Sequence, residues 1–320
     1  MKQKKINLMV LIGLVVVLIG LIICYLTVDS GGNWDYILPL RSKKMLAFCI
    51  VGITTTVATI SFQTITGNQI LTPSILGLDS LYILFQTMVL FVYGNSHLLL
   101  ADRKVNFLVS VGLMVMASGF LYTFIFKNHH TNLYLLLMLG MIAGTFFKSI
   151  STFMQVLMDP NEFDKIQGKL FASFNNIDVS ILALTVLVGS IALFFLIRKS
   201  AVLDVLHLGR EQAINLGVVV EKELLHILVL ISILTAVSTA LVGPITFLGF
   251  IVANLTYRMF KTYQHFWLFI GGSLLGIVVL LIGQLLVERV FHLTTTVSVV
   301  IEFIGGCYFI FLLLKERKQG

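Results

Sequence analysis

Ten long apolar segments follow one another along this chain of 320 residues. A helix needs about 20 consecutive apolar residues to cross the hydrocarbon core of a bilayer. The segments lie at about 6–28, 45–66, 74–93, 105–126, 132–157, 177–197, 224–243, 245–260, 266–290 and 297–314. Because backbone polar groups in lipid must be satisfied within the segment, spans of this kind are helical. The chain is therefore predicted to be an all-α, polytopic integral membrane protein, with residues 1–320 forming a single transmembrane domain.

Charged residues are scarce, since Asp, Glu, Lys and Arg make up 12% of the chain and hydrophobic residues make up 58%. Soluble domains keep about a quarter of their residues charged, so this composition excludes a soluble fold. The net charge of +7 does not indicate a nucleic-acid partner, because no basic patch is interleaved with aromatic residues. Membrane lipid is the expected surrounding, and topology accounts for the positive charge.

Lys and Arg residues indicate the orientation, because they are enriched in cytoplasmic loops. With the N-terminus inside, the predicted spans leave 13 of the 22 Lys and Arg residues on the cytoplasmic side and 8 on the outer side. This bias favours a topology in which both termini and the long polar loop at about 198–223 are cytoplasmic. The acidic run 159–164 then lies outside.

Residues that form catalytic or metal sites do not occur at the spacings such sites need. The 7 His residues are scattered at the ends of spans, and the 3 Cys residues match no Cys-x-x-Cys pattern. There is no Gly-x-x-x-x-Gly-Lys-Ser/Thr motif, so a P-loop for ATP is absent from the sequence. We therefore expect a protein that is not an enzyme and that binds no metal or cofactor itself.

Four short motifs carry the strongest indications of function. Residues 40–47 read Leu-Arg-Ser-Lys-Lys-Met-Leu-Ala and lead into the second span. Residues 63–77 run from Gln through Asn and Pro to Leu-Gly. Residues 211–217 have the spacing Glu-x-Ala-x-x-x-Gly within the polar loop. Residues 242–252 read Val-Gly-Pro-Ile-Thr-Phe-Leu-Gly-Phe-Ile-Val.

Together these motifs resemble the FecCD family of permeases, which import iron-siderophores, haem and cobalamin in bacteria. The resemblance covers essentially the whole chain, and the Gly-Pro-Ile-Thr-Phe-Leu-Gly stretch is its most specific part. Lys43 and Gln69 replace two prolines that are usual in the family, and Ala253-Asn254 stand where Pro-His is usual. These departures are most similar to the ferric-siderophore branch.

The resemblance implies the permease subunit of an ATP-binding-cassette (ABC) importer that moves a ferric siderophore across the bacterial cytoplasmic membrane. The implied partners are ATPase subunits that bind ATP and Mg, a second permease, homologous or identical, and an extracytoplasmic substrate-binding lipoprotein. Cobalamin or haem is the alternative cargo. The sequence leaves open which siderophore is carried and whether the two permeases form a homodimer or a heterodimer.

The polar loop 198–223 is expected to dock the ATPase. Small side chains permit close approach of a partner, and a glycine can end a helix. We expect Glu211, Ala213 and Gly217 to share one face of a short helix that fits a groove of the ATPase. The predicted docking residues are Leu208, Gly209, Glu211, Ala213, Leu216 and Gly217. The alternative is a solvated interfacial helix between two spans.

A polar stripe marks the second span. Thr55, Thr59 and Gln63 recur every four residues, and Thr66 lies near the same face. The stripe is about 12 Å long and offers polar groups without fixed charge. We interpret it as lining for the translocation path, and the alternative is that these residues bond their own backbone or join helices.

Two breaks in the apolar pattern indicate irregular backbone within the membrane. Asn68 and Pro73 follow the second span and favour a turn, where the resemblance also places a gate. Gly243 and Pro244 separate the seventh and eighth spans and, with Gly249, form the signature turn. Such breaks persist in a bilayer only where protein or a water-filled cavity satisfies the backbone.

Lys148 and Glu302 lie within predicted spans, and Glu302 is interpreted as the one clear carboxylate among them. A charge at the centre of a span costs roughly 2.5–3.5 kcal/mol, so it is not expected to face lipid. We expect both to face the interior, where they pair or bracket a polar route. The alternative for Lys148 is a snorkelling side chain. Gly140 and Gly144 form a GxxxG pattern that favours close packing.

Three basic residues, Arg41, Lys44 and Arg289, are predicted on the outer surface. The resemblance implies that such positions meet acidic residues of the binding protein, and complementary charge would steer that encounter. The alternative is anchoring at the level of the lipid headgroups.

Two other classes of function compete with the importer. An ion-driven secondary transporter would need several intramembrane carboxylates and inverted repeats, and we find no convincing repeat. A membrane scaffold or sensor without transport activity is the second alternative. Co-purification with an ATPase whose hydrolysis depends on this chain would separate the three.

Overall fold

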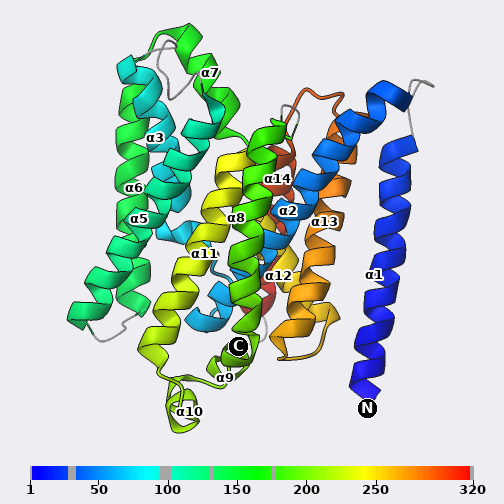
Figure 1. The fold of residues 1–320 in the computed structure, drawn as a ribbon, viewed down its shortest axis with the longest axis vertical. Helices are drawn as coiled ribbons and strands as arrows, with labels where there is room; N and C mark the ends of the chain where they lie inside the picture. Colours follow the sequence, from blue (N-terminus) through cyan, green and yellow to red (C-terminus); the bar gives the residue numbers. More distant parts are fainter. Residues whose placement is uncertain (1, 28–33, 94–101, 130–132, 175–176, 318–320) are drawn as a thin grey trace.

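The computed structural model describes residues 2–27, 34–93, 102–129, 133–174 and 177–317, which fold into one bundle of helices (Figure 1). The elements are α1 (Lys2–Thr27), α2 (Trp34–Thr66), the 3-10 turn η1 (Pro73–Leu76), α3 (Leu78–Tyr93), α5 (Arg103–His129), α6 (Leu133–Val156), α7 (Pro160–Leu170), α8 (Val179–Arg198), α9 (Ser200–Leu206), α10 (Arg210–Asn215), α11 (Val220–Val242), α12 (Leu248–Met259), α13 (His265–Arg289) and α14 (Val297–Arg317). No strand occurs in these ranges, so the all-α prediction is confirmed.

Each of the ten predicted apolar segments contains a helix, but the helices differ in length. Seven, namely α1, α2, α5, α6, α8, α11 and α13, are long and apolar enough to cross a membrane. The apolar parts of α3 and α14 are shorter. Helix α12 has 12 residues, which at 1.5 Å per residue is about 18 Å, so it cannot cross a hydrocarbon core alone. The predicted span 245–260 is therefore a turn followed by a half-length helix.

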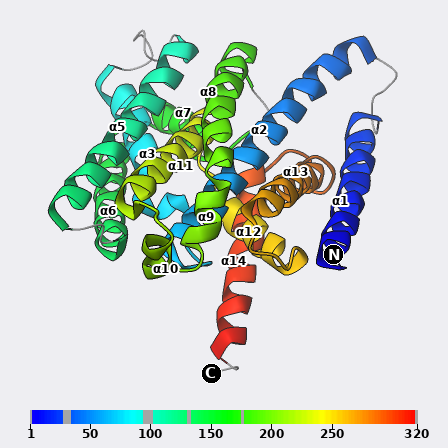
Figure 2. The same ribbon diagram turned by 60° about the horizontal axis from the view of Figure 1, so that its bottom comes forward.

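Helix α2 runs obliquely through the centre of the bundle (Figure 1). It packs against α13, α11, α12 and α8. Helices α3, α5 and α6 lie together on one side of it, and α1 lies on the opposite side, in both views (Figures 1 and 2). Exposed apolar side chains are frequent on α1 and α6, as expected for helices that face lipid or another membrane protein.

Glycines allow the backbones of α2 and α13 to touch. A Cβ atom on Gly52 would lie 2.8 Å from the backbone nitrogen of Ile277, and one on Gly276 would lie 2.6 Å from the carbonyl oxygen of Gly52. Small residues of this kind drive close helix packing in membranes, where the hydrophobic effect between helices is weak. The two helices therefore form a tightly joined pair.

Buried hydroxyl groups join α11 to its neighbours. The hydroxyls of Thr54 on α2 and Ser238 on α11 are 2.6 Å apart. Tyr122 on α5 makes an equally short hydrogen bond to Ser232, 2.6 Å between the oxygens. Interhelical bonds of this kind are worth roughly 0.6 kcal/mol each in membranes, so they orient α11 more than they stabilise it.

The polar loop and the N-terminus lie at one end of the bundle, and α7 lies at the other (Figure 1). The final turns of α14 also point toward the end that carries α9 and α10 (Figure 2). This arrangement agrees with the predicted topology, in which that end is cytoplasmic.

At the α7 end, the Asp178 carboxylate accepts the backbone N–H of Ser180 and caps α8. The Ser180 hydroxyl donates to the same carboxylate. The two hydrogen bonds, from the hydroxyl and from the backbone N–H, hold the pKa of Asp178 below its usual value.

Candidate translocation path and docking loop

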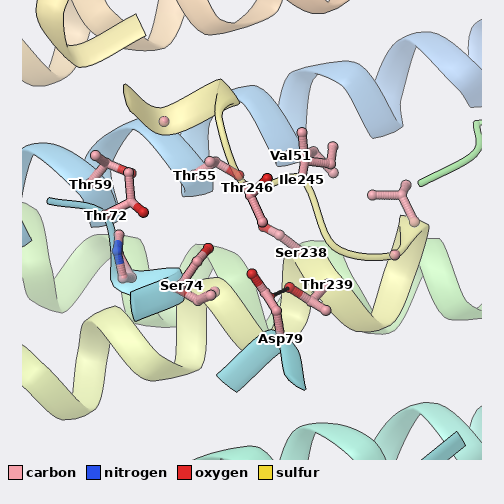
Figure 3. Close-up of a pocket in the computed structure, with 15 residues that line it drawn as sticks. Val51, Thr55, Thr59, Thr72, Ser74, Asp79, Ser238, Thr239, Ile245 and Thr246 are labelled. Carbon is pink, nitrogen blue, oxygen red and sulfur yellow. Dashed lines mark hydrogen bonds between the residues drawn. The ribbon is translucent and has the colours of Figure 1, made fainter. Parts of the chain in front are cut away.

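Thr55 and Thr59 line a small polar cavity in the middle of the bundle (Figure 3). Its volume is about 30 Å³, which is enough for a water molecule but not for a substrate. The walls come from α2, from η1 and the start of α3, from α11, and from the turn before α12. The remaining lining residues are Val51, Thr72, Pro73, Ser74, Asp79, Thr235, Ser238, Thr239, Val242, Gly243, Ile245, Thr246 and Gly249. We call this space the hydroxyl cavity.

Asp79 is a buried carboxylate of the hydroxyl cavity that the sequence analysis missed. Its Oδ1 accepts a hydrogen bond of 2.9 Å from the hydroxyl of Thr239, and Ser74 lines the same cavity (Figure 3). The interpretation of Glu302 as the one clear carboxylate within a span is therefore wrong. The signal was available in the sequence, because Asp79 follows Gly77 by two residues inside a predicted span.

The signature turn forms one wall of the hydroxyl cavity. Gly243 has a φ of 99°, a conformation that favours glycine, and it ends α11. The backbone is irregular from Gly243 to the start of α12, and the cavity gives its polar groups a polar surrounding, as expected for a break in the membrane. Gly249 packs against the side chain of Thr59 on α2. The turn and the predicted path-lining helix are thus in direct contact.

Gln63 and Thr66 do not join Thr55 and Thr59. They line a separate recess of about 350 Å³ at the end of α2, whose other walls are Thr64, Ile65, Gly67, Gln69, Leu206, His207, Gly209, Arg210 and Tyr257. We call this space the loop recess. The loop recess lies between the end of α2 and the polar loop. The predicted polar stripe is therefore divided, with Thr55 and Thr59 in the hydroxyl cavity and Gln63 and Thr66 in the loop recess.

The predicted gate is held by amide side chains. Gly67 has a φ of 63°, and Asn68 accepts the backbone N–H of Ile70 at 2.9 Å. The carbonyl of Gln69 accepts the amides of Gln63 at 2.6 Å and Asn254 at 3.1 Å. Asn254 occupies the position where the family usually has His, and sequence reasoning gave it no role.

The rest of the gate rests on α6. Pro73 begins η1, and Gly77 ends it with a φ of 79°. A Cβ atom on Gly140 would lie 2.9 Å from the Cα of Leu76, and one on Gly144 would lie 3.0 Å from the Cα of Gly77. The GxxxG pattern therefore does make a close contact, but its partner is a turn and not a helix.

The polar loop folds into α9 and α10, which are separated by Gly209 with a φ of 107°. Ala213 is fully buried against its own chain, whereas Glu211 is exposed, and Gly217 lies beyond the end of α10. The prediction that Glu211, Ala213 and Gly217 share one helix face is therefore wrong. Residues two apart on a helix point about 200° apart, and α10 is too short to include position 217.

Exposed apolar side chains mark the outer surface of this loop. Leu208 is 56% exposed and Leu216 is 62% exposed, and Ile214 and Val219 are similarly open. Two ion pairs fix the loop to the start of α11, Lys199 with Glu223 at 2.7 Å and Arg210 with Glu221 at 2.9 Å. An apolar patch on a polar segment outside the spans is typical of a protein interface.

Lys148 and Glu302 lie apart. Lys148 is exposed on α6, which packs on α3 and η1. Glu302 is half-buried on α14 and accepts a hydrogen bond of 3.3 Å from Thr246 of the signature turn. The half-buried position of Glu302 agrees with the expectation that it faces the interior. The same expectation is wrong for Lys148, which is exposed on the single chain.

The predicted outer basic residues differ in accessibility. Arg41 donates to the backbone carbonyls of Tyr25, at 2.5 Å, and Leu26, at 3.2 Å, and its guanidinium lies over the Tyr25 ring. Lys44 lies 3.9 Å from a carboxylate oxygen of Glu288. Arg289 is exposed. Arg41 thus joins the end of α1 to α2, a role that the sequence did not indicate.

Taken together, a bundle of membrane-spanning helices, a broken helix at a buried polar cavity and an apolar patch on a polar loop define a multi-pass membrane transport protein. Within the described ranges, no three His, Cys, Asp or Glu side chains gather closely enough to hold a metal ion. Residues 5–315 match the FecCD transport family, and the chain belongs to that family.

Comparison with known proteins agrees with this assignment. The chain is 46% identical over 317 residues to the petrobactin import system permease protein YclO of Bacillus subtilis, with 99% of each chain covered. It is 38% identical to the petrobactin import system permease protein FatC of Bacillus anthracis, over 87% of this chain and 78% of that one. A solved structure described as an inward-facing metal-chelate type ABC transporter has the same fold, with a TM-score of 0.81 at 21% identity, covering 97% of this chain and 99% of that one.

Proposed function

We propose that this chain is the permease subunit of an ABC importer that carries a ferric siderophore across the cytoplasmic membrane. The observation that carries the mechanism is the loop recess, where residues of the polar loop and of the gate line one space. The polar loop and the gate are therefore neighbours, so a displacement of the loop can be passed on to the gate. ATP and Mg are bound by a separate ATPase subunit in this proposal, and this chain binds no cofactor.

The polar loop is the proposed docking site for that ATPase. Leu208 and Leu216 present apolar surface at the end predicted to be cytoplasmic, where a partner can cover it. Gly209 and Gly217 set the turns that hold the two leucines there, and Glu211 adds an exposed charge. Ala213 was predicted to contact the ATPase, but its side chain is buried. Its small size is instead proposed to let α10 pack closely against the rest of the permease.

The proposed substrate is a ferric siderophore, and the first candidate is the ferric complex of petrobactin. This follows from the full-length similarity to permeases named for petrobactin import. The hydroxyl cavity is too small to hold such a molecule, so the path is proposed to form against a second permease, homologous or identical. A substrate-binding lipoprotein is proposed to dock at the opposite end, where Arg289 is the exposed member of the three predicted basic residues.

The substrate assignment is tested in cells that lack this chain and regain it from a plasmid. We expect restored uptake of radioactive iron from ferric petrobactin and at least 10-fold less from haem or ferric hydroxamates. Restored uptake of haem or cobalamin in preference to ferric petrobactin would overturn the substrate assignment and leave the transport class intact.

The docking assignment is tested by Leu208→Asp combined with Leu216→Asp. We expect loss of ATPase co-purification and loss of uptake, with a normal amount of the permease in the membrane. The control is Lys222→Asp, because Lys222 is exposed at the same end without being part of the apolar patch. Normal co-purification of the ATPase with the double variant would contradict the docking role.

One observation favours the alternative of an ion-driven transporter, namely that the carboxylate of Asp79 is buried. The two classes of transporter differ in their energy source, which is ATP for the importer and an ion gradient for the alternative. Uptake that survives depletion of ATP but stops when the ion gradient is collapsed would favour it over the importer.

A further inference from the structure

The N-terminus of α13 is capped by a residue from the polar loop. The carboxylate oxygen Oδ1 of Asp204, on α9, accepts the backbone N–H of His265 at 2.7 Å. The residue that precedes the helix, Gln264, makes no side-chain cap of its own. The first N–H groups of a helix have no partner within it, so Asp204 supplies from 61 residues away what the local sequence does not.

The same carboxylate also holds the His265 ring. Its Oδ1 lies 2.6 Å from Nδ1, and on the other side of the ring Nε2 lies 2.7 Å from the hydroxyl oxygen of Thr64 on α2. The ring is 1% exposed, and both of its nitrogens have partners, as a buried imidazole requires. Asp204, His265 and Thr64 thus form one continuous line from the polar loop to α2.

The line is complete in either protonation state of the ring. In the neutral ring, Nδ1 donates to Asp204, and Nε2 accepts a hydrogen bond from the Thr64 hydroxyl. In the charged ring, Nε2 donates to the Thr64 oxygen, and the Thr64 hydroxyl donates its hydrogen bond to the carbonyl of Ile60, which lies 2.9 Å away. The connection between α9 and α2 therefore does not depend on which form is present.

Thr64 is well placed to act on the gate. Its neighbour Gln63 holds the carbonyl of Gln69, and Gly67 begins the gate three residues later. Because α2 and α13 touch through their glycines, a displacement of the N-terminus of α13 cannot be absorbed between them.

We propose that Asp204, His265 and Thr64 are positioning residues that transmit movement of the polar loop to the gate end of α2. They contact neither substrate nor ATP, and they act by fixing α9, α13 and α2 to one another. The inference rests on the proposed function, since it takes the polar loop to be the site where the ATPase pulls. It goes beyond that function by naming the connection through which the pull reaches the gate.

The test measures siderophore uptake and ATP hydrolysis together, with the complete transporter in proteoliposomes. Thr64→Val keeps the side-chain shape and removes the hydroxyl. We expect hydrolysis within about twofold of the unmodified transporter and uptake per ATP at least fivefold lower. Thr123→Val is the matched control, because the Thr123 hydroxyl bonds only the backbone of its own helix, and its uptake per ATP should be unchanged.

Two further variants separate coupling from simple stabilisation. Asp204→Ala should lower uptake per ATP, and Asp204→Asn, which keeps an oxygen acceptor, should restore most of it. Asp204→Ala combined with Thr64→Val should be no worse than the more severe single variant, because both changes break the same line. Uptake per ATP that stays normal in Thr64→Val overturns the inference, and so does a parallel fall of uptake, hydrolysis and thermal stability.

The outcome also distinguishes this inference from the proposed function. If the Leu208 and Leu216 variants lose the ATPase while Thr64→Val keeps normal coupling, the docking role stands and the connection is refuted. If the ATPase remains bound when both leucines are replaced, the docking role itself has failed.

Discussion

The hydroxyl oxygen of Thr59 on α2 lies directly against the α-carbon of Gly249 at the start of α12. A Cβ atom at position 249 would overlap that oxygen, and it would also lie 3.0 Å from the Cβ of Thr59. The last glycine of the signature turn is therefore required by the approach of a threonine that is 190 positions earlier in the chain, and not by its own backbone conformation. This contact closes one side of the hydroxyl cavity.

Gly249→Ala is expected to destabilise the protein by about 1–3 kcal/mol and to reduce uptake, because a methyl group is forced into a packed contact. Thr59→Ala in the same chain should recover part of the loss, since it removes the hydroxyl and methyl that the new side chain meets. The measurement is thermal unfolding in detergent, followed by iron uptake. Gly306→Ala serves as control, because a Cβ atom there meets nothing within 4 Å.

Gly140→Ala and Gly144→Ala are expected to displace η1, because each new methyl group meets the backbone of the turn. We expect a cost of about 1–3 kcal/mol for each and lower uptake. Gly112→Ala on α5, where a Cβ atom meets no neighbour, should be neutral or slightly stabilising. Equal behaviour of all three variants in thermal unfolding would show that η1 does not rest on α6 as described.

Asp79 is expected to act through its hydrogen bond and not through its charge. Asp79→Asn keeps an oxygen that accepts from Thr239, so uptake should be retained. Asp79→Leu removes the acceptor of the buried Thr239 hydroxyl and should destabilise the protein by about 1–3 kcal/mol. Loss of uptake in Asp79→Asn, with stability unchanged, would instead indicate that the carboxylate takes part in ion coupling.

Arg41→Ala is expected to loosen α1 and to cost about 1–2 kcal/mol, because hydrogen bonds from a charged group to the carbonyls of Tyr25 and Leu26 are lost. Lys43→Ala, at an exposed position nearby, should have little effect on thermal unfolding. Arg289→Glu reverses an exposed charge and should weaken capture of the loaded binding protein. If Arg41→Ala abolishes capture at normal stability, Arg41 is a docking residue after all.

Lys148→Cys is expected to react with a membrane-impermeant thiol reagent in the assembled transporter. A lysine exposed on a membrane-spanning helix is costly against lipid, so position 148 is expected to face the water path in the assembled transporter. The background carries Cys24, Cys49 and Cys307 replaced by Ser. Phe146→Cys is the control, because it is exposed about 200° around the same helix. Absence of labelling at both 146 and 148 would place Lys148 in lipid and contradict this prediction.

Much of the helical layout was predictable, because a 20-residue apolar run has one stable solution in a bilayer. The sequence indicated a polar stripe at Thr55 and Thr59 and a break at Gly243-Pro244, although it could not show that these residues meet in one cavity. It failed at Ala213, where the small side chain serves packing within the chain. It also failed at α12, where the apolar segment 245–260 was predicted to span the membrane although its helix has only 12 residues.

What the sequence determined by itself is the sequence of spans, their helical character and the family, since these depend on hydrophobicity and on short motifs read locally. Only the tertiary structure decided that Asp204 caps a helix 61 residues away, that Asp79 is buried beside Thr239, and that Lys148 points outward. Such pairings depend on the rotation of each helix about its axis. That rotation is set by glycine contacts and hydroxyl bonds between distant segments, which no local pattern records.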